Sequence, residues 1–131
     1  MRVLVACEES QEVCKAFRAK GHEAYSCDIL PCSGGHPEWH IRDSIFHVLC
    51  NPLTMFWDLI IAHPPCTFLT VANTYITRGC SKYTKDEAAE EVRMAKMFFM
   101  SLVHSNCERI CIENPIGIMS TEYRKPDQII Q

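Results

Sequence analysis

Short apolar runs alternate with amphipathic stretches along this chain. Apolar runs of four to six residues, as in the buried strands of a parallel sheet, occupy residues 2–6, 22–27, 57–62 and 109–112. A weaker run lies near residues 39–41, and apolar residues recur at helical spacing over residues 10–21 and 84–102. This alternation predicts an α/β fold with a mostly parallel, Rossmann-like sheet and helices on both faces.

Capping residues indicate where the helices begin. Ser10 is a suitable N-cap for the first helix, and Glu12 is favourable in its first turn. Ser44 can cap a brief second helix. Thr84 and Glu87 have the spacing of a capping box at the start of the longest helix.

The length and the cysteine content set the broad class. A chain of 131 residues fits one domain, so we expect a single domain over residues 1–131. Residues 68–83 are expected to form a loop, and residues 115–131 an irregular C-terminal tail. No apolar stretch is long enough to cross a membrane, so no membrane association is expected. Nine cysteines, an odd number, without a secretory signal indicate reduced thiols in the cytoplasm.

The charge distribution bears on nucleic-acid binding. A protein that binds DNA alone usually has a basic patch, because neutralisation of phosphates dominates the affinity. The formal charge here is −3, and no dense run of basic residues occurs. We therefore expect the chain to bind DNA only weakly when it acts alone.

Two residues at the ends of predicted strands have the side chains for a specific reaction. Pro64 and Pro65 follow one strand and restrict the backbone before Cys66, whose thiol could act as a partly exposed nucleophile. Glu113 ends another strand, and in an apolar setting its carboxyl could stay protonated and donate to a substrate. A thiolate that attacks cytosine C6 and a carboxyl at N3 together suit methylation of cytosine C5. The alternatives are a buried inert cysteine and a surface glutamate.

A cofactor would lie where ligands of open α/β sheets bind, outside the carboxyl ends of the strands. Asp28 lies 20 positions after Glu8, where an acidic residue can bind ribose hydroxyls, and Asp43 could meet an adenine amino group. Both aspartates could instead cap helices or lie in solvated turns. The first turn, residues 7–11, has no glycine and contains two glutamates. This turn disfavours NAD, FAD and ATP and suits a cofactor with a cationic sulfonium and an amino group.

A metal site is a further hypothesis. Zinc could be held by four side chains in the turn-rich segment that follows the second strand: Cys27, Cys32, His36 and His40. Their compact spacing differs from that of common zinc fingers, and a loop whose histidines face solvent is the alternative. A zinc deaminase would need a second cysteine soon after Pro65-Cys66, and none is present.

The ordered motifs resemble those of the cytosine-C5 DNA methyltransferase family, in the small divergent form carried by phages and prophages. They are Val3-Leu4-Val5-Ala6-Cys7, Asp28, His40-Ile41-Arg42-Asp43, Ala62-His63-Pro64-Pro65-Cys66 and Ile112-Glu113-Asn114-Pro115. The resemblance implies the Rossmann-like methyltransferase sheet, S-adenosylmethionine as cofactor and DNA as substrate. It also implies that Cys66 is the nucleophile and Glu113 the N3 contact.

The resemblance further implies roles for surrounding residues. Contacts with the cofactor would come from Ala6, Cys7, Glu8, Ser10, Gln11, Asp28, Ile29, Asp43 and Pro64. Contacts with the substrate would come from Pro65 and Asn114.

The family's later motifs do not follow Asn114, so we expect a truncated member that lacks the last strands. The strand at 109–112 would then be an exposed edge, and we expect it to pair with a second copy in a homodimer; cover by the tail at 116–131 is the alternative. The alternatives are a catalytically inactive module for cofactor binding or interaction, and a small zinc-binding structural protein.

Overall fold

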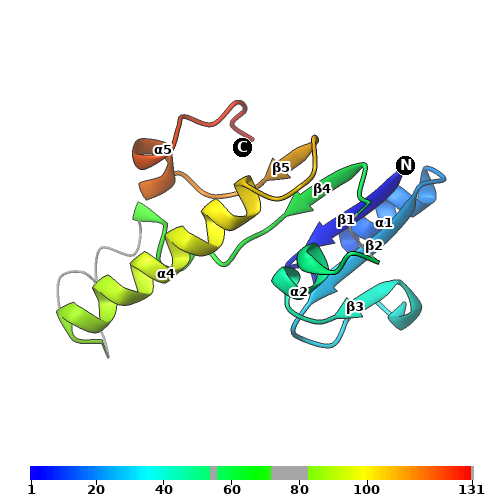
Figure 1. The fold of residues 1–131 in the computed structure, drawn as a ribbon, viewed down its shortest axis with the longest axis horizontal. Coiled ribbons are helices and arrows are strands. Elements are labelled where there is room, and N and C mark those ends of the chain that lie inside the picture. The colour runs from blue at the N-terminus through cyan, green and yellow to red at the C-terminus, as the bar shows by residue number, and fades with distance from the viewer. Residues whose placement is uncertain (54–55, 72–82, 131) are drawn as a thin grey trace. The chain divides into compact units, whose positions relative to one another are not determined.

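The computed structural model describes residues 1–53, 56–71 and 83–130. Its elements, drawn in Figure 1, are β1 (Arg2–Ala6), α1 (Glu12–Ala19), β2 (Glu23–Asp28), the 3-10 helix η1 (Pro37–Trp39), β3 (His40–Arg42), α2 (Ile45–Cys50), β4 (Leu59–Ala62), α4 (Lys85–Val103), β5 (Ile110–Ile112) and α5 (Ile118–Glu122). Each predicted strand has a counterpart among these elements.

The five strands form one sheet in the order β3-β2-β1-β4-β5, and every pair of neighbours is parallel. The first three strands extend the sheet in one direction, and β4 then returns to the other side of β1. The order therefore reverses between β1 and β4, and a sheet of this kind binds ligands at that switch point. The predicted α/β, Rossmann-like fold is confirmed, with α1 on one side of the sheet and α2 on the other (Figure 1).

The core lies on the central strands. Val3 and Val5 of β1 point to one face and pack with Cys14 of α1 and Ala24 of β2, all of them fully buried. Because successive side chains of a strand alternate between faces, Leu4 points to the opposite face, and it is also fully buried. Burial on both faces explains why β1 reads as an uninterrupted apolar run.

Contacts divide the chain into two compact units. The first consists of Met1–Pro64 with Leu102–Glu113 and contains the sheet, and the second consists of Pro65–Ser101 with Asn114–Gln131. The predicted single domain over residues 1–131 stays a prediction. Of the predicted loop at 68–83, residues 72–82 lie outside the described residues.

The second unit has its own contacts. Leu69 and Met119 are buried, Phe99 packs edge-on against Tyr123, and Thr70 forms an antiparallel bridge with Gly117. A Cβ at Gly117 would clash with the carbonyl oxygen of Leu69, so this approach requires glycine. The region expected to be an irregular tail therefore differs from the prediction, because it contains α5. The motif signals favoured no helix there since α5 has only five residues and no side-chain cap.

The predicted caps were only partly right. The capping box at α4 is confirmed: the backbone N–H of Thr84 donates to Glu87 Oε2 (2.7 Å), and the N–H of Glu87 donates to Thr84 Oγ1 (3.2 Å). Ser44 occupies the N-cap position of α2 but makes no capping hydrogen bond with its side chain. Its backbone N–H instead donates to Asp43 Oδ1 (2.6 Å).

Candidate functional site

The turn between β1 and α1 forms the centre of the candidate site. Cys7 and Gln11 both have left-handed backbone conformations, with φ of 60° and 61°. Such conformations in non-glycine residues cost about 1–3 kcal/mol each and persist only where surrounding contacts hold them. Here the N–H groups of Cys7 and Glu8 both donate to the carbonyl of Cys27 in β2, at 2.8 and 3.2 Å. The turn is therefore anchored to the neighbouring strand.

Glu8, and not Ser10, caps the first helix. The carboxylate of Glu8 accepts hydrogen bonds from the backbone N–H of Val13 (2.6 Å) and of Cys14 (3.2 Å), and the residue is only 6% exposed. The N-cap position belongs to Gln11, whose side chain makes no capping hydrogen bond. The prediction of Ser10 as N-cap was wrong. The left-handed conformations in the turn place the side chain of Glu8, which precedes the helix, beside the N–H groups of Val13 and Cys14.

An open depression of about 340 Å³ lies beside this turn. It is lined by Cys7, Glu8, Glu9, Ser10, Glu12, Val13 and His63. All but one of these residues follow β1, and His63 follows β4, where its N–H donates to the carbonyl of Ala6 (3.0 Å). The depression therefore lies at the carboxyl ends of β1 and β4, which is the switch point of the sheet.

The lining of the depression is acidic. Its charged residues are three glutamates, and neither lysine nor arginine contributes to it. The Glu8 carboxylate is used by α1, and the Glu12 carboxylate pairs with Lys15 Nζ at 2.6 Å. The Glu9 carboxylate makes no hydrogen bond or ion pair with any residue that the structure describes. Glu9 is therefore the negative charge of the depression that is left for a ligand.

His63 provides a second polar group at the depression. Its Nε2 atom is buried and has no hydrogen-bond partner among the described residues. Its Nδ1 atom lies 3.6 Å from Glu113 Oε2, so the two side chains form an ion pair when the imidazole is protonated. A buried polar atom without a partner is destabilising unless a water or a ligand satisfies it.

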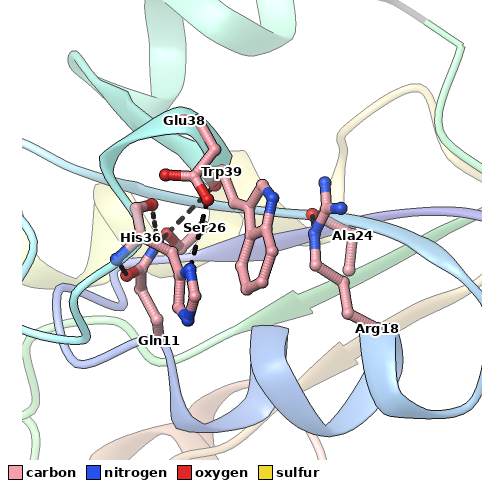
Figure 2. Close-up of polar contacts among 7 residues, drawn as sticks. All are labelled: Gln11, Arg18, Ala24, Ser26, His36, Glu38 and Trp39. Atoms are coloured by element: carbon pink, nitrogen blue, oxygen red, sulfur yellow. Dashed lines mark hydrogen bonds and ion pairs between the residues drawn. The ribbon is translucent and has the colours of Figure 1, made fainter.

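Gln11 fastens the loop after β2 to the first turn. Its side chain is fully buried; Nε2 donates to His36 O (2.8 Å) and to Ser26 Oγ (3.2 Å), and Oε1 accepts from the N–H of His36 (3.0 Å), as Figure 2 shows. Gly34 permits this approach, because a Cβ there would collide with the backbone oxygen of Ser10 and with Gln11 Cβ. The structure thus shows an internal role for the Gln11 amide, and its predicted contact with a cofactor stays a prediction.

Aromatic stacking extends the same attachment. His36 stacks on Trp39 with ring centroids 3.7 Å apart, and the guanidinium of Arg18 lies over the Trp39 ring at 4.4 Å (Figure 2). Arg18 also donates from Nε to the carbonyl of Ala24 (2.7 Å). These contacts connect α1, β2 and the loop on one side of the sheet.

The two thiols closest to the first turn are poor nucleophiles. Burial, aided by the negative charge of Asp28, raises the pKa of Cys7 to about 11. Burial, with further contributions from Cys7, Asp28 and Asp43, raises the pKa of Cys27 to about 12. Because only the thiolate attacks an electrophile, neither cysteine is suited to nucleophilic catalysis near neutral pH.

The two aspartates predicted to contact the cofactor have local partners. Asp28 Oδ1 accepts from the N–H of Leu30 (2.9 Å) and closes a turn. Asp43 Oδ1 accepts from the N–H of Ser44 and lies 2.9 Å from His47 Nδ1. These hydrogen bonds, that from His47 first, lower the pKa of Asp43. Asp43 therefore has partners in the residues that follow it, at the start of α2, and its predicted contact with a cofactor stays a prediction.

The proposed zinc set does not come together. Within the residues that the structure describes, no group of three or more His, Cys, Asp or Glu side chains could hold a metal ion. Cys27 Sγ donates to the carbonyl of Asp43 (3.4 Å), and His36 stacks on Trp39. His40 uses Nδ1 with Ser26 Oγ and Nε2 with the carbonyl of Leu30, both at 2.9 Å. The fold uses Cys27, His36 and His40 to hold the loop, and the zinc hypothesis stays a prediction.

The two residues of the predicted reaction lie in different units of the chain. Cys66 is half-buried, as predicted, and its carbonyl accepts from the N–H groups of Leu69 and Thr70 at 2.9 and 3.1 Å. Glu113 ends β5, and its N–H donates to the carbonyl of Ala62 (2.9 Å). Its side chain is 62% exposed, so the apolar setting expected for this carboxyl is absent.

The depression includes three of the nine residues predicted to contact the cofactor: Cys7, Glu8 and Ser10. Six predicted residues do not line it: Ala6, Gln11, Asp28, Ile29, Asp43 and Pro64. Four lining residues were not predicted: Glu9, Glu12, Val13 and His63. Glu9, Glu12 and Val13 could have been found from their position, because they lie in the turn and the first helical residues that follow the carboxyl end of a predicted strand.

No protein-family model, curated protein or solved structure matches this chain. Among the described residues, no helix combines the length and the apolar character that a membrane span requires. The class of the protein is therefore given by its fold: an α/β protein with an all-parallel sheet and an acidic depression at the switch point.

Proposed function

We propose that this chain binds S-adenosylmethionine in the acidic depression beside the first turn. The observation that carries the proposal is the position and charge of the depression: it lies at the switch point of a parallel sheet and is lined by Glu8, Glu9 and Glu12 without a lysine or an arginine. A cofactor with a sulfonium and an ammonium group is complementary to that charge.

The helix beside the depression favours the same class of cofactor. Phosphate-bearing cofactors are commonly bound by free N–H groups at a helix N-terminus. The N–H groups of Val13 and Cys14 already donate to Glu8. A pyrophosphate at this position would therefore lie against the Glu8 carboxylate and would lack free hydrogen-bond donors. Glu9 remains to pair with a cationic group of the ligand.

The proposed reaction is methylation of cytosine C5 in DNA. When bound, the cofactor supplies an electrophilic methyl group. The Cys66 thiolate would add to C6 of the base while Glu113 contacts N3, and C5 would then take the methyl group; loss of the C5 proton to a base from solvent would expel the Cys66 thiolate and restore the ring. The ordered Pro-Pro-Cys and Glu-Asn motifs support these roles, and Pro64 and Pro65 restrict the backbone that leads to the thiol.

Calorimetric titration tests cofactor binding. We expect S-adenosylmethionine to bind, and ATP and NAD to bind far more weakly or not at all. Glu9→Gln should weaken binding of S-adenosylmethionine about two- to fivefold, as expected for one exposed ion pair. Glu12→Gln is the matched control with a smaller effect, because Glu12 already pairs with Lys15. Absence of binding by the wild-type protein, or tighter binding of ATP, would contradict the proposal.

A second candidate is a module that binds the cofactor without catalysing methyl transfer. The exposure of Glu113 favours it, since the side chain is open to solvent and lacks the apolar setting that the proposed N3 contact calls for. Transfer of radiolabelled methyl groups to DNA separates the two candidates. If the chain is catalytic, the wild type should incorporate labelled methyl groups into DNA, and Cys66→Ser should abolish this incorporation. Cys50→Ser, which changes an exposed cysteine of α2, should retain it. Binding of the cofactor without incorporation by the wild type supports the second candidate.

A further inference from the structure

The outer edge of β5 has backbone groups that no described strand uses. β5 is the last strand in the sheet order. Arg109 accepts from Ile60, and Glu113 donates to Ala62, so the odd-numbered residues direct their backbone groups toward β4. Because these groups alternate along a strand, the N–H and C=O groups of Ile110 and Ile112 point away from β4.

The residues along this edge are complementary to themselves when the strand is reversed. From residue 109 to residue 113 the chain reads Arg-Ile-Cys-Ile-Glu. Reversal exchanges Arg109 with Glu113 and Ile110 with Ile112, and it leaves Cys111 at the centre. Arg109, Cys111 and Glu113 share one face of the strand and are exposed, whereas the two isoleucines are half-buried on the other face.

We propose that a second copy of this chain adds its β5 antiparallel to this edge, with Cys111 on the two-fold axis. Each Ile110 then exchanges both backbone hydrogen bonds with Ile112 of the second copy. Arg109 lies directly opposite Glu113 of the second copy, and the reverse pair follows from the symmetry. Opposite charges in directly facing cross-strand pairs are stabilising.

Neighbouring registers lack this complementarity. A two-fold axis at Ile110 places Arg109 opposite Cys111 of the second copy. An axis at Ile112 places Glu113 opposite Cys111. Both arrangements leave the charges without an opposite partner. The charge pattern therefore selects the register centred on Cys111, and this inference does not depend on the proposed methyltransferase chemistry.

The register makes a geometric prediction for Cys111. Because the isoleucine pairs carry the hydrogen bonds, the two Cys111 residues form a non-hydrogen-bonded pair with Cα atoms about 4.5 Å apart. Disulfides form at Cα separations of about 4.4–6.8 Å. Diamide, which takes up the two electrons and two protons that a pair of thiols releases, should therefore couple the two copies through Cys111.

Charge reversal tests the interface by sedimentation over a concentration series. The wild type should form a dimer, and Arg109→Glu or Glu113→Arg should weaken it about tenfold or more, since each change creates two like-charge pairs. The double variant Arg109→Glu/Glu113→Arg should restore the dimer, because the same charges face each other with exchanged positions. A wild type that stays monomeric at high micromolar concentration, or a double variant no better than the single ones, would overturn the proposal.

Cross-linking tests the register itself. After treatment with diamide, Cys111→Ser should lose the covalent dimer, whereas Cys50→Ser, which removes another exposed cysteine, should retain it. Circular dichroism of each variant establishes that the fold is kept. A covalent dimer that survives in Cys111→Ser and disappears in Cys50→Ser would place the contact elsewhere and refute the β5 interface.

Discussion

Replacement of Glu8 by alanine should strongly destabilise the protein, although this residue lies in an open depression. The change removes both acceptors of the N–H groups of Val13 and Cys14. Hydrogen bonds to charged groups contribute about 1.5–3 kcal/mol each, and loss of a helix cap costs about 0.5–2 kcal/mol. Water can reach Val13, but Cys14 is fully buried, so its N–H would lose a partner without replacement. We expect a loss of about 2–4 kcal/mol in the free energy of unfolding.

Urea unfolding followed by tryptophan fluorescence measures this loss, since Trp57 is buried in the native protein. Glu8→Gln keeps one oxygen acceptor and should lose about half as much as Glu8→Ala. Glu12→Ala is the control: Glu12 lies in the same depression but is exposed and pairs only with Lys15, so the change should stay within about 0.5 kcal/mol. The capping role is refuted if Glu8→Ala and Glu12→Ala destabilise the protein equally.

Two further predictions concern the same region. Gly34→Ala should reduce the free energy of unfolding by about 1–3 kcal/mol, because its Cβ would collide with Ser10 and Gln11, whereas the exposed control Ser33→Ala should leave it nearly unchanged in urea unfolding. The stability should also fall as the pH rises from about 9 to about 11. In this interval the unfolded Cys7 thiol, with an ordinary pKa of 9.0, ionises while burial keeps the folded thiol protonated up to about 11. Unfolding curves at pH 8 and pH 10.5 should differ less for Cys7→Ala than for the wild type, and an equal difference would contradict this reasoning.

Predictions from the sequence were right where one local pattern of residues determines the structure. The boundaries of β1 were right because its apolar run is buried on both faces, and the capping box of Thr84 and Glu87 was right because both partners lie within one helical turn. The cap of α1 was missed, since the left-handed conformations of Cys7 and Gln11 bring Glu8 to the helix, and neither residue type signals such a turn. The contribution of His63 depends on β4 lying beside β1, which periodicity alone does not reveal.

The attachment of the loop after β2 has a consequence for how related sequences can differ. Gln11 holds the backbone of His36 from 25 positions away, and Gly34 gives it the room to do so. A relative with a larger residue at position 34 would have to lose the amide at position 11 as well, and a relative with a shorter loop would leave that amide buried without partners. We therefore expect these positions to covary, and the length of this loop to be preserved wherever Gln11 is retained.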